Sequence, residues 1–179
     1  SLIGKDSFQE VDITGISMPI TKCNYLVKDP GALADVLREA FAIARSGRPG
    51  PVLVDIPKDL TTQVCEFTPA SPVHPAPPAQ PDAAALAQAA AVLNEAKRPL
   101  VYFGGGVISA GAAPLLRQLV AKANLPAVHT LMAAGALRWD DPMNLGMLGM
   151  HGRYSANRAV EEADALLCVG ARFSDRVAL

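Results

Sequence analysis

Apolar residues recur every three or four positions between residues 30 and 47, and this spacing predicts an amphipathic helix. Pro30 suits the first turn of that helix, and Gly47 suits its C-terminal cap. Short apolar, β-rich runs stand on both sides of it, at 20–27 and at 51–57. A strand, a helix and a second strand in this order predict a βαβ unit.

A second and longer series begins with an alanine-rich stretch that has a high helix propensity. Helices and strands are predicted to alternate there, in the order 81–97, 99–106, 111–124, 125–131, 155–163 and 164–172. Such alternation is typical of a doubly wound parallel sheet, so the fold class is α/β. The sequence stops at Leu179, after a strand and before a helix that would cover it, and we interpret this second sheet as truncated.

Six prolines in fourteen positions separate the two series, in the segment TPASPVHPAPPAQP at 68–81. Proline has no backbone N–H and a fixed φ, so this segment cannot continue a helix or enter the interior of a sheet. We therefore predict a first domain at 1–64, a linker at 65–81 and a second domain at 82–179.

Charge and composition exclude several classes of protein. The formal net charge is −1, from 16 Lys and Arg against 17 Asp and Glu, so no basic field attracts nucleic acid or an anionic membrane. No apolar run approaches the ~20 residues of a transmembrane helix. The cysteines Cys23, Cys65 and Cys168 are widely spaced, which favours a reducing intracellular compartment over a disulfide framework or a zinc site. Cys168 lies in the apolar run ALLCVGA and is predicted to be buried.

Ligands of open α/β sheets bind beyond the carboxyl ends of the strands. Glycines at 104–106 follow one predicted strand and could admit a phosphate, or they could serve a tight turn. Arg172 and Arg176 follow the last strand and could pair with a diphosphate, or they could be solvated surface residues. The stretch NLGMLGMHGRYSAN at 144–157 combines apolar side chains with bare backbone, as a large ligand would require. No GxGxxG fingerprint, catalytic triad, paired carboxylates or metal-ligand cluster is found, so no reaction is indicated.

Several motifs together resemble a known family. They are GKDSFQE (4–10), ITKCNYLV (20–27), SGRPGPVLVDIPKD (46–59), TLMAAGA (130–136), LGMLGMHG (145–152) and GARFSDRV (170–177). They are similar to the catalytic subunits of the acetohydroxyacid synthase (acetolactate synthase) family of thiamine-diphosphate-dependent enzymes. The motif GRPGPVLVDIP is shared across that superfamily, whereas MLGMHG followed by RFSDR is much more specific.

The resemblance implies that residues 1–64 end a pyrimidine-binding domain and that 82–179 form much of a central domain that holds FAD. The residues that would contact or border FAD are Arg48, Gly104, Gly105, Thr130, Leu131, Leu148, Gly149, Met150, His151, Gly170, Ala171, Arg172, Asp175 and Arg176. Phe8, Gln9 and Lys58 would face the substrate entrance across a dimer interface. The sequence departs from the family's pattern at Ala133 and Ala134, where LMGLGA is usual, and at Ser174, where an acidic residue is usual.

The resemblance also implies an activity for the whole enzyme. It would decarboxylate pyruvate on thiamine diphosphate and join the two-carbon unit to a second 2-oxo acid, pyruvate or 2-oxobutanoate. The activating glutamate and the Mg²⁺ site would lie outside this chain, so no catalytic residue is expected here and the fragment alone is expected to be inactive. A homodimer or homotetramer with a regulatory small subunit is implied, in the bacterial cytoplasm or, in a eukaryote, in an organelle. The alternatives are another thiamine-diphosphate carboligase, a pyruvate oxidase, or a non-catalytic nucleotide-binding module.

Overall fold

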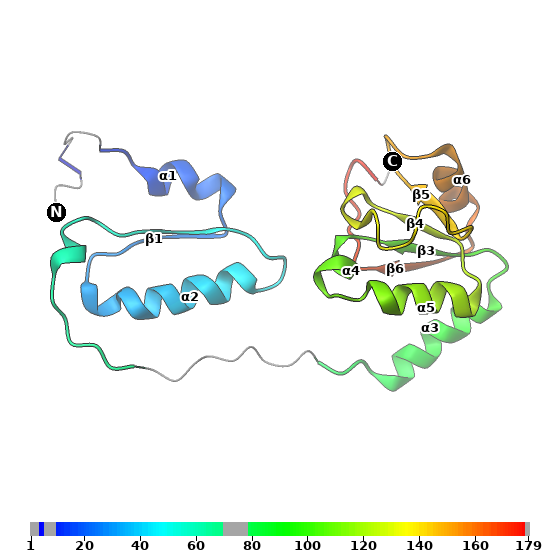
Figure 1. The fold of residues 1–179 in the computed structure, drawn as a ribbon, viewed down its shortest axis with the longest axis horizontal. Helices are drawn as coiled ribbons and strands as arrows, with labels where there is room; N and C mark the ends of the chain where they lie inside the picture. The colour runs from blue at the N-terminus through cyan, green and yellow to red at the C-terminus, as the bar shows by residue number, and fades with distance from the viewer. Residues whose placement is uncertain (1–3, 6–9, 70–78, 178–179) are drawn as a thin grey trace. The chain divides into compact units, whose positions relative to one another are not determined.

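A computed structural model describes residues 4–5, 10–69 and 79–177, and the chain divides into two compact units, Ser1–Pro78 and Ala79–Leu179. Each unit has a parallel sheet of its own (Figure 1). The predicted entrance residues Phe8 and Gln9 lie outside the described residues, as does most of the proline-rich segment. Within the described part of the chain, no helix is long and apolar enough to cross a membrane.

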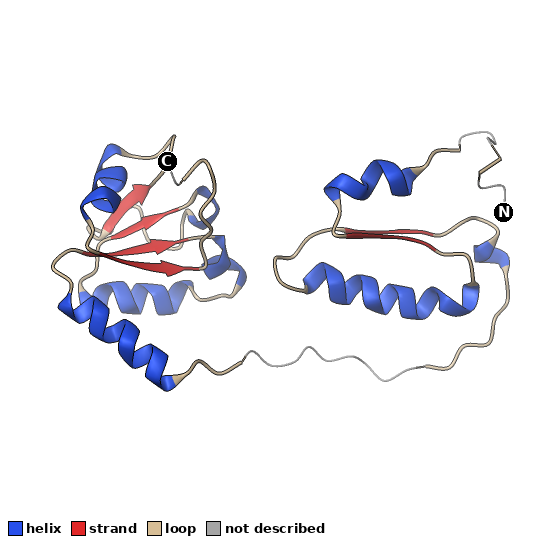
Figure 2. Ribbon diagram, turned by 180° about the vertical axis from the view of Figure 1, so that it is seen from behind, coloured by secondary structure: helices blue, strands red, loops and turns tan. Residues whose placement is uncertain are grey.

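The first unit is built on two parallel strands, β1 (Cys23–Leu26) and β2 (Val52–Asp55), which are connected through α2 (Leu33–Arg45). Helix α2 lies on one side of the strand pair and α1 (Ile13–Ser17) on the other (Figures 1 and 2). The structure confirms the βαβ unit that the apolar pattern predicts. Strand β1 is shorter than the predicted range 20–27, and Ile20 belongs instead to the 3₁₀ turn Met18–Ile20.

Carboxylates begin both helices of this unit. The Asp12 carboxylate accepts a hydrogen bond from the Gly15 N–H at 2.9 Å, at the start of α1. The Asp29 carboxylate accepts one from the Gly31 N–H at 3.1 Å, in the 3₁₀ turn Pro30–Ala32 that leads into α2. Each bond satisfies a backbone donor that has no partner inside the turn, which explains why the chain enters a helix at these points.

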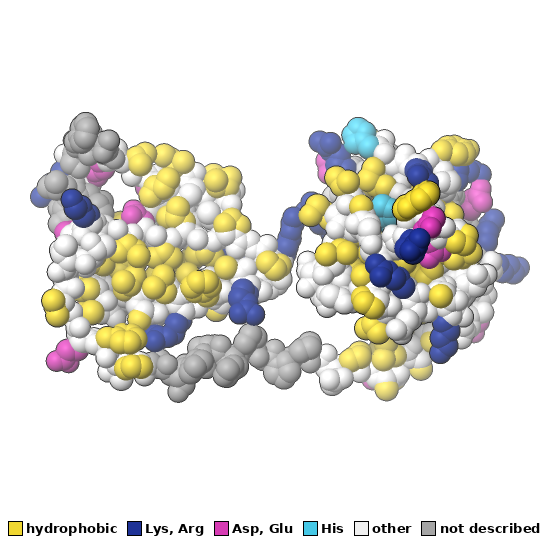
Figure 3. Space-filling model, in the orientation of Figure 1, with side chains coloured by type: hydrophobic (Ala, Val, Ile, Leu, Met, Phe, Trp, Pro, Cys, Tyr) yellow, Lys and Arg dark blue, Asp and Glu magenta, His cyan; other side chains and the backbone are white. Residues whose placement is uncertain are grey.

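The first unit buries a small core and exposes much apolar surface. Among its described residues, the buried apolar side chains are Val27, Ala40 and Leu60. Large apolar side chains are exposed on both helices, including Ile16 (59%) and Phe41 (69%). Hydrophobic atoms accordingly cover much of the visible face of this unit in Figure 3. Contiguous apolar surface of this kind is typical of a surface that contacts other protein.

The second unit contains a four-stranded, fully parallel sheet in the order β5-β4-β3-β6. The strands are β3 (Pro99–Phe103), β4 (Ala127–His129), β5 (Asn144–Met147) and β6 (Ala165–Val169). The helices are α3 (Ala83–Glu95), α4 (Gly105–Ser109), α5 (Ala113–Ala123) and α6 (Tyr154–Glu162). The prediction of a doubly wound α/β fold is confirmed.

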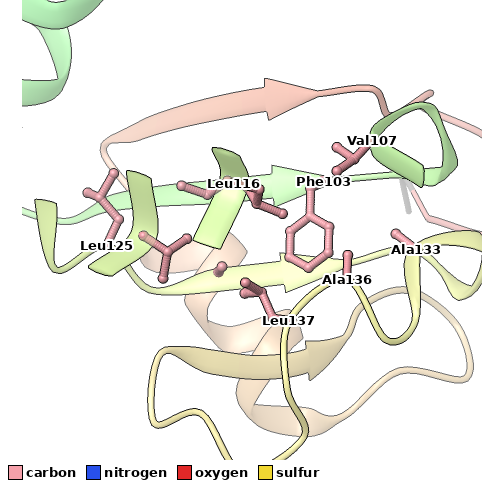
Figure 4. Packing of buried hydrophobic residues seen from close by; sticks show 10 residues of the cluster. Phe103, Val107, Leu116, Leu125, Ala133, Ala136 and Leu137 are labelled. Atoms are coloured by element: carbon pink, nitrogen blue, oxygen red, sulfur yellow. The ribbon is translucent and has the colours of Figure 1, made fainter. Parts of the chain in front are cut away.

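The central strand β3 is buried on both faces. Val101 and Phe103 point into one cluster, where Phe103 contacts Val107, Leu116 and Leu137 near α4 and α5 (Figure 4). Leu100 and Tyr102 point into a second cluster with residues of β4 and α6. Successive side chains of a strand point to opposite faces of the sheet. A strand that helices cover on both faces therefore needs apolar residues at every position.

The outer strands of the sheet account for two differences from the sequence analysis. Cys168 is exposed, so its predicted burial is wrong. It lies on β6, an edge strand, where Leu166 on the same face is also exposed. Strand β5 was not predicted, because Gly146 in the middle of it has a φ of +99° and the β4–β5 register shifts between Ala127 and Val128.

Asp164 ties the amino ends of β3 and β6 together. Its carboxylate accepts hydrogen bonds from the N–H groups of Arg98 and Lys97, both at 2.8 Å. These bonds lower the pKa of the Asp164 carboxyl, with the Arg98 amide as the largest cause. The two strands are thus held in register, and their carboxyl ends emerge side by side.

Candidate functional site at the carboxyl edge of the second sheet

The strand order of the second sheet reverses between β3 and β6. The chain passes from β3 outward to β4 and β5, and then crosses back to β6 on the other side of β3. In doubly wound sheets, ligands bind where the strand order reverses in this way, outside the carboxyl ends of the strands. The loops at this point are 104–106 after β3 and 170–176 after β6.

Two of the three glycines after β3 are required by packing between those loops. A Cβ on Gly104 would lie 2.6 Å from the Gly170 carbonyl oxygen, and one on Gly106 would lie 2.7 Å from the Gly170 Cα. The Gly106 N–H also donates to the Gly170 carbonyl at 2.9 Å. A Cβ on Gly105 would lie 3.0 Å from the Met132 Cβ, a tight contact but a longer one than at the other two glycines. The glycine run therefore has a structural reason before any ligand is considered.

The turn after β5 is packed against the loop after β6. Gly149 has a φ of +98°, and a Cβ there would lie 2.3 Å from the Arg176 carbonyl oxygen. The same oxygen accepts a hydrogen bond from the Met150 N–H at 2.9 Å. Leu148 and Gly149 are buried, whereas Met150 and His151 are exposed. The bare backbone in MLGMHG thus permits loop contact, while the Met150 and His151 side chains face outward.

Tyr102, in β3, holds the loop after β6 in place. Its side chain is buried in β3, and its hydroxyl donates to the Arg172 carbonyl at 3.0 Å. The Phe173 ring packs edge-on against the Tyr102 ring with the centroids 5.6 Å apart. Burial raises the pKa of the Tyr102 hydroxyl, so it remains a hydrogen-bond donor at neutral pH. The Arg172 backbone is anchored, and its side chain is exposed.

The turn after β4 completes this edge. The Thr130 N–H donates to the Phe103 carbonyl at 3.0 Å, and the 3₁₀ turn Leu131–Ala133 follows. Ala133 is fully buried in the core below, but Leu131 and Met132 are 71% and 76% exposed. The small residue at Ala133, which differs from the family's pattern, is therefore part of the packed core.

The structure brings most of the predicted FAD residues to this one edge. They follow the four parallel strands and comprise Gly104, Gly105, Thr130, Leu131, Leu148, Gly149, Met150, His151, Gly170, Ala171, Arg172, Asp175 and Arg176. The Arg176 guanidinium lies 3.9 Å from the Asp175 carboxylate. Arg48 and Lys58 belong to the first unit and are exposed there.

Lys22 holds the turn that carries Arg48. Its ammonium group donates to the carbonyls of Ile43 at 2.7 Å and Ser46 at 2.6 Å, at the end of α2, and to that of Arg48 at 3.2 Å. A cation at a helix C-terminus stabilises the free carbonyls. The motif SGRPG is thereby fixed, and the Arg48 side chain extends outward from it.

Sequence reasoning missed three features of this edge. Asn157, in α6, bonds both backbone groups of Gly149, and Tyr102 supports the loop after β6. Beside β5 there is also a pocket of about 290 Å³, lined in part by His129, Trp139 and Arg153. In the sequence, each of these residues is only a polar or aromatic residue within a few positions of a glycine. That arrangement is too common to indicate a site.

The class of protein follows from a match to a family model. The model described as "Thiamine pyrophosphate enzyme, central domain" matches residues 86–178, which lie within the second unit. The chain therefore belongs to the thiamine-diphosphate-dependent enzymes, and its second unit is their central domain.

Individual relatives narrow the resemblance to one kind of enzyme. The chain is 53% identical over 177 residues to the acetolactate synthase isozyme 1 large subunit of Escherichia coli K12. It is 49% identical over 180 residues to the acetolactate synthase large subunit of Parasynechococcus marenigrum and 47% identical over 175 residues to isozyme 2 of E. coli. Each match covers 98% of this chain but only 31%, 29% and 32% of the relative, respectively. The chain thus spans about a third of these relatives, and the resemblance drawn from its motifs is confirmed.

Proposed function

We propose that this chain is the part of an acetolactate synthase large subunit that binds FAD and borders the substrate entrance. The enzyme would decarboxylate pyruvate and join the two-carbon unit to a second 2-oxo acid, in branched-chain amino-acid biosynthesis. Support comes from the names of relatives that are 47–53% identical across nearly the whole chain. Thiamine diphosphate, held with Mg²⁺, would supply the electron sink for decarboxylation, and the protein would orient the reactants.

The carboxyl edge of the second sheet fits FAD by its chemistry. Arg172 and Arg176 present guanidinium groups that can pair with a diphosphate. Leu131, Met132 and Met150 present exposed apolar surface, which an aromatic ring system can cover. The observation that carries the proposal is this combination of cationic and apolar side chains along the carboxyl edge of one parallel sheet. FAD bound there would be largely structural, and the residues of the edge would position and shield it.

The first unit would contribute to the active site of an oligomer. Arg48 would reach the flavin, and Lys58, with Phe8 and Gln9, would border the substrate entrance across a dimer interface. The exposed apolar side chains on α1 and α2 support contact with further protein. A homodimer or homotetramer is proposed, with a regulatory small subunit as the partner, because several relatives are named large subunits.

A titration of the purified chain with FAD tests the proposal. We expect flavin fluorescence to change saturably and the second unit to be stabilised, by about 2.7 kcal/mol at an FAD concentration 100 times the Kd. Replacing Arg172 and Arg176 together by glutamine should weaken binding. The matched control is Arg138→Gln, because Arg138 is also exposed but pairs with Asp140 before β5. A folded chain that does not bind FAD would contradict the assignment.

An activity assay tests the second part of the proposal. With pyruvate, thiamine diphosphate, Mg²⁺ and FAD, the 179-residue chain alone is expected to form no acetolactate. A longer chain that also contains the regions of the relatives that this chain does not cover should form acetolactate without consuming oxygen. Oxygen uptake with pyruvate would indicate an oxidase instead.

A further inference from the structure

Asn157 is bonded to both backbone groups of a single residue. Its side-chain Oδ1 accepts a hydrogen bond from the Gly149 N–H at 2.8 Å, and its Nδ2 donates to the Gly149 carbonyl at 3.1 Å. Asn157 lies in the first turn of α6, eight positions after Gly149. A carboxamide is the neutral side chain that can satisfy a donor and an acceptor of one residue at once.

Gly149 directs its backbone polar groups toward a neighbouring helix. Its φ of +98° belongs to neither a helix nor a strand, and its N–H and carbonyl are turned toward α6. The Gly149 carbonyl also accepts from the Gly152 N–H at 2.8 Å, which closes the turn that carries Met150 and His151. Asn157 therefore determines where this turn, and hence its two exposed side chains, lie.

The same turn is hydrogen-bonded to the loop after β6. The Met150 N–H, next to Gly149, donates to the Arg176 carbonyl at 2.9 Å. The Arg176 carbonyl also lies against Gly149, where no Cβ would fit. The Val177 N–H, one residue further, is bonded to the Ser174 carbonyl at 2.9 Å. A shift of Gly149 would therefore move the segment that carries Arg176.

Helix formation alone does not explain an asparagine at this position. Asparagine is a poor residue inside a helix, since its side chain competes for backbone groups. The helix already has a link to β5, because the Ser155 hydroxyl donates to the Leu145 carbonyl at 3.2 Å. The Asn157 carboxamide adds two hydrogen bonds that fix the position of Gly149.

We infer that Asn157 is a positioning residue for the flavin edge. It holds the turn 148–152 in its ligand-binding form and, through the Met150–Arg176 hydrogen bond, holds the loop that carries Arg172 and Arg176. This inference rests on the proposed FAD site, but its mechanical part, the coupling of the two loops, does not depend on any ligand.

Asn144 provides a matched control. Its Oδ1 accepts from the Gly146 N–H at 3.1 Å and its Nδ2 donates to the Arg138 carbonyl at 2.9 Å, so it makes the same two kinds of bond. It begins β5, at the opposite end of the strand from the turn 148–152. Asn144→Ala and Asn157→Ala should therefore lower the melting temperature by similar amounts.

The first measurement is amide hydrogen exchange on the full chain without ligand. Asn157→Ala should speed exchange about tenfold at Gly149 and at Met150, with a smaller increase at Val177, because the opened turn becomes more populated. Asn157→Asp, which keeps the acceptor but lacks the donor, should fall between Asn157→Ala and the unchanged chain. Faster exchange at Gly149 alone would contradict the coupling, and unchanged exchange at both Gly149 and Met150 would contradict the inference entirely.

The second measurement is FAD affinity, from flavin fluorescence, well below the melting temperatures. Asn157→Ala should raise the apparent Kd about tenfold relative to Asn144→Ala, since the competent turn is then populated only a fraction of the time. Equal Kd values in the two variants would overturn the positioning role. If the unchanged chain is folded but does not bind FAD, the proposed function fails, and the exchange data alone then decide whether Asn157 couples the two loops.

Discussion

Replacing Gly149 by alanine tests whether the turn after β5 and the loop after β6 are packed as tightly as the structure shows. At a φ of +98°, a residue with a Cβ loses about 1–2 kcal/mol relative to glycine. The Cβ would also lie 2.3 Å from the Arg176 carbonyl oxygen, which is backbone and cannot rotate away. Relieving that contact costs about 1–3 kcal/mol, and losing the Met150–Arg176 hydrogen bond costs about 1 kcal/mol. The total is about 3–6 kcal/mol, a large part of the ~5–15 kcal/mol that stabilises a domain.

Gly111→Ala separates the backbone effect from the contact. Gly111 also has a positive φ, +64°, but a Cβ there would meet no atom within 4 Å. We therefore expect this variant to lose only about 1–2 kcal/mol. The loss should be measured in urea by native-state hydrogen exchange at the amides of Val101–Phe103, because these amides report on the second unit alone. The reasoning is refuted if Gly149→Ala is destabilised no more than Gly111→Ala.

Three further changes probe the core and its titrating groups. Phe103→Ala, at a side chain that is 0% exposed, should cost about 3–5 kcal/mol in urea unfolding, and a loss below about 1 kcal/mol would contradict the packing around Phe103. Tyr102→Phe should cost about 1 kcal/mol near pH 7. Because the folded pKa of Tyr102 is raised, its contribution is fully present below about pH 10 and is lost as the pH rises through the folded value, so the stability difference from the phenylalanine variant should shrink at high pH. The folded pKa of Asp164 is lowered, so its contribution is present above about pH 4 and is lost as the pH falls through the folded value. Asp164→Asn should therefore lower the melting temperature near pH 7 and weaken its fall in acid; an unchanged acid limb would contradict the role of the Asp164 bonds.

The regular elements could be predicted because their apolar spacing matches how they are buried. Helix α2 keeps one partly buried face, and β3 is apolar at every position because helices cover both of its sides. Strand β5 could not be predicted in the same way. It is four residues long, contains a glycine at positive φ, and pairs with β4 through a register shift, so it has no clean period of two.

The candidate site could be located from the sequence only as a set of strand ends. The order β5-β4-β3-β6 is a tertiary fact, and it decides which of those ends are neighbours. Cys168 illustrates the limit, because the run ALLCVGA is apolar enough to be buried, yet β6 is an edge strand and that face is exposed. Asn157 illustrates the same limit, because nothing in the neighbouring sequence distinguishes an asparagine that bonds a distant turn from one that is solvated.

The glycines of this edge have a consequence for how function is inferred from glycine-rich turns. Gly104, Gly106 and Gly149 each face the backbone of another loop, at distances that exclude a Cβ. A glycine run at a strand end therefore need not face a ligand, and here it brings the loops after β3, β5 and β6 together. Met150 and Arg172 belong to these packed loops and keep exposed side chains. If the proposed FAD site is correct, loss of this loop packing should weaken FAD binding even where FAD touches none of the glycines.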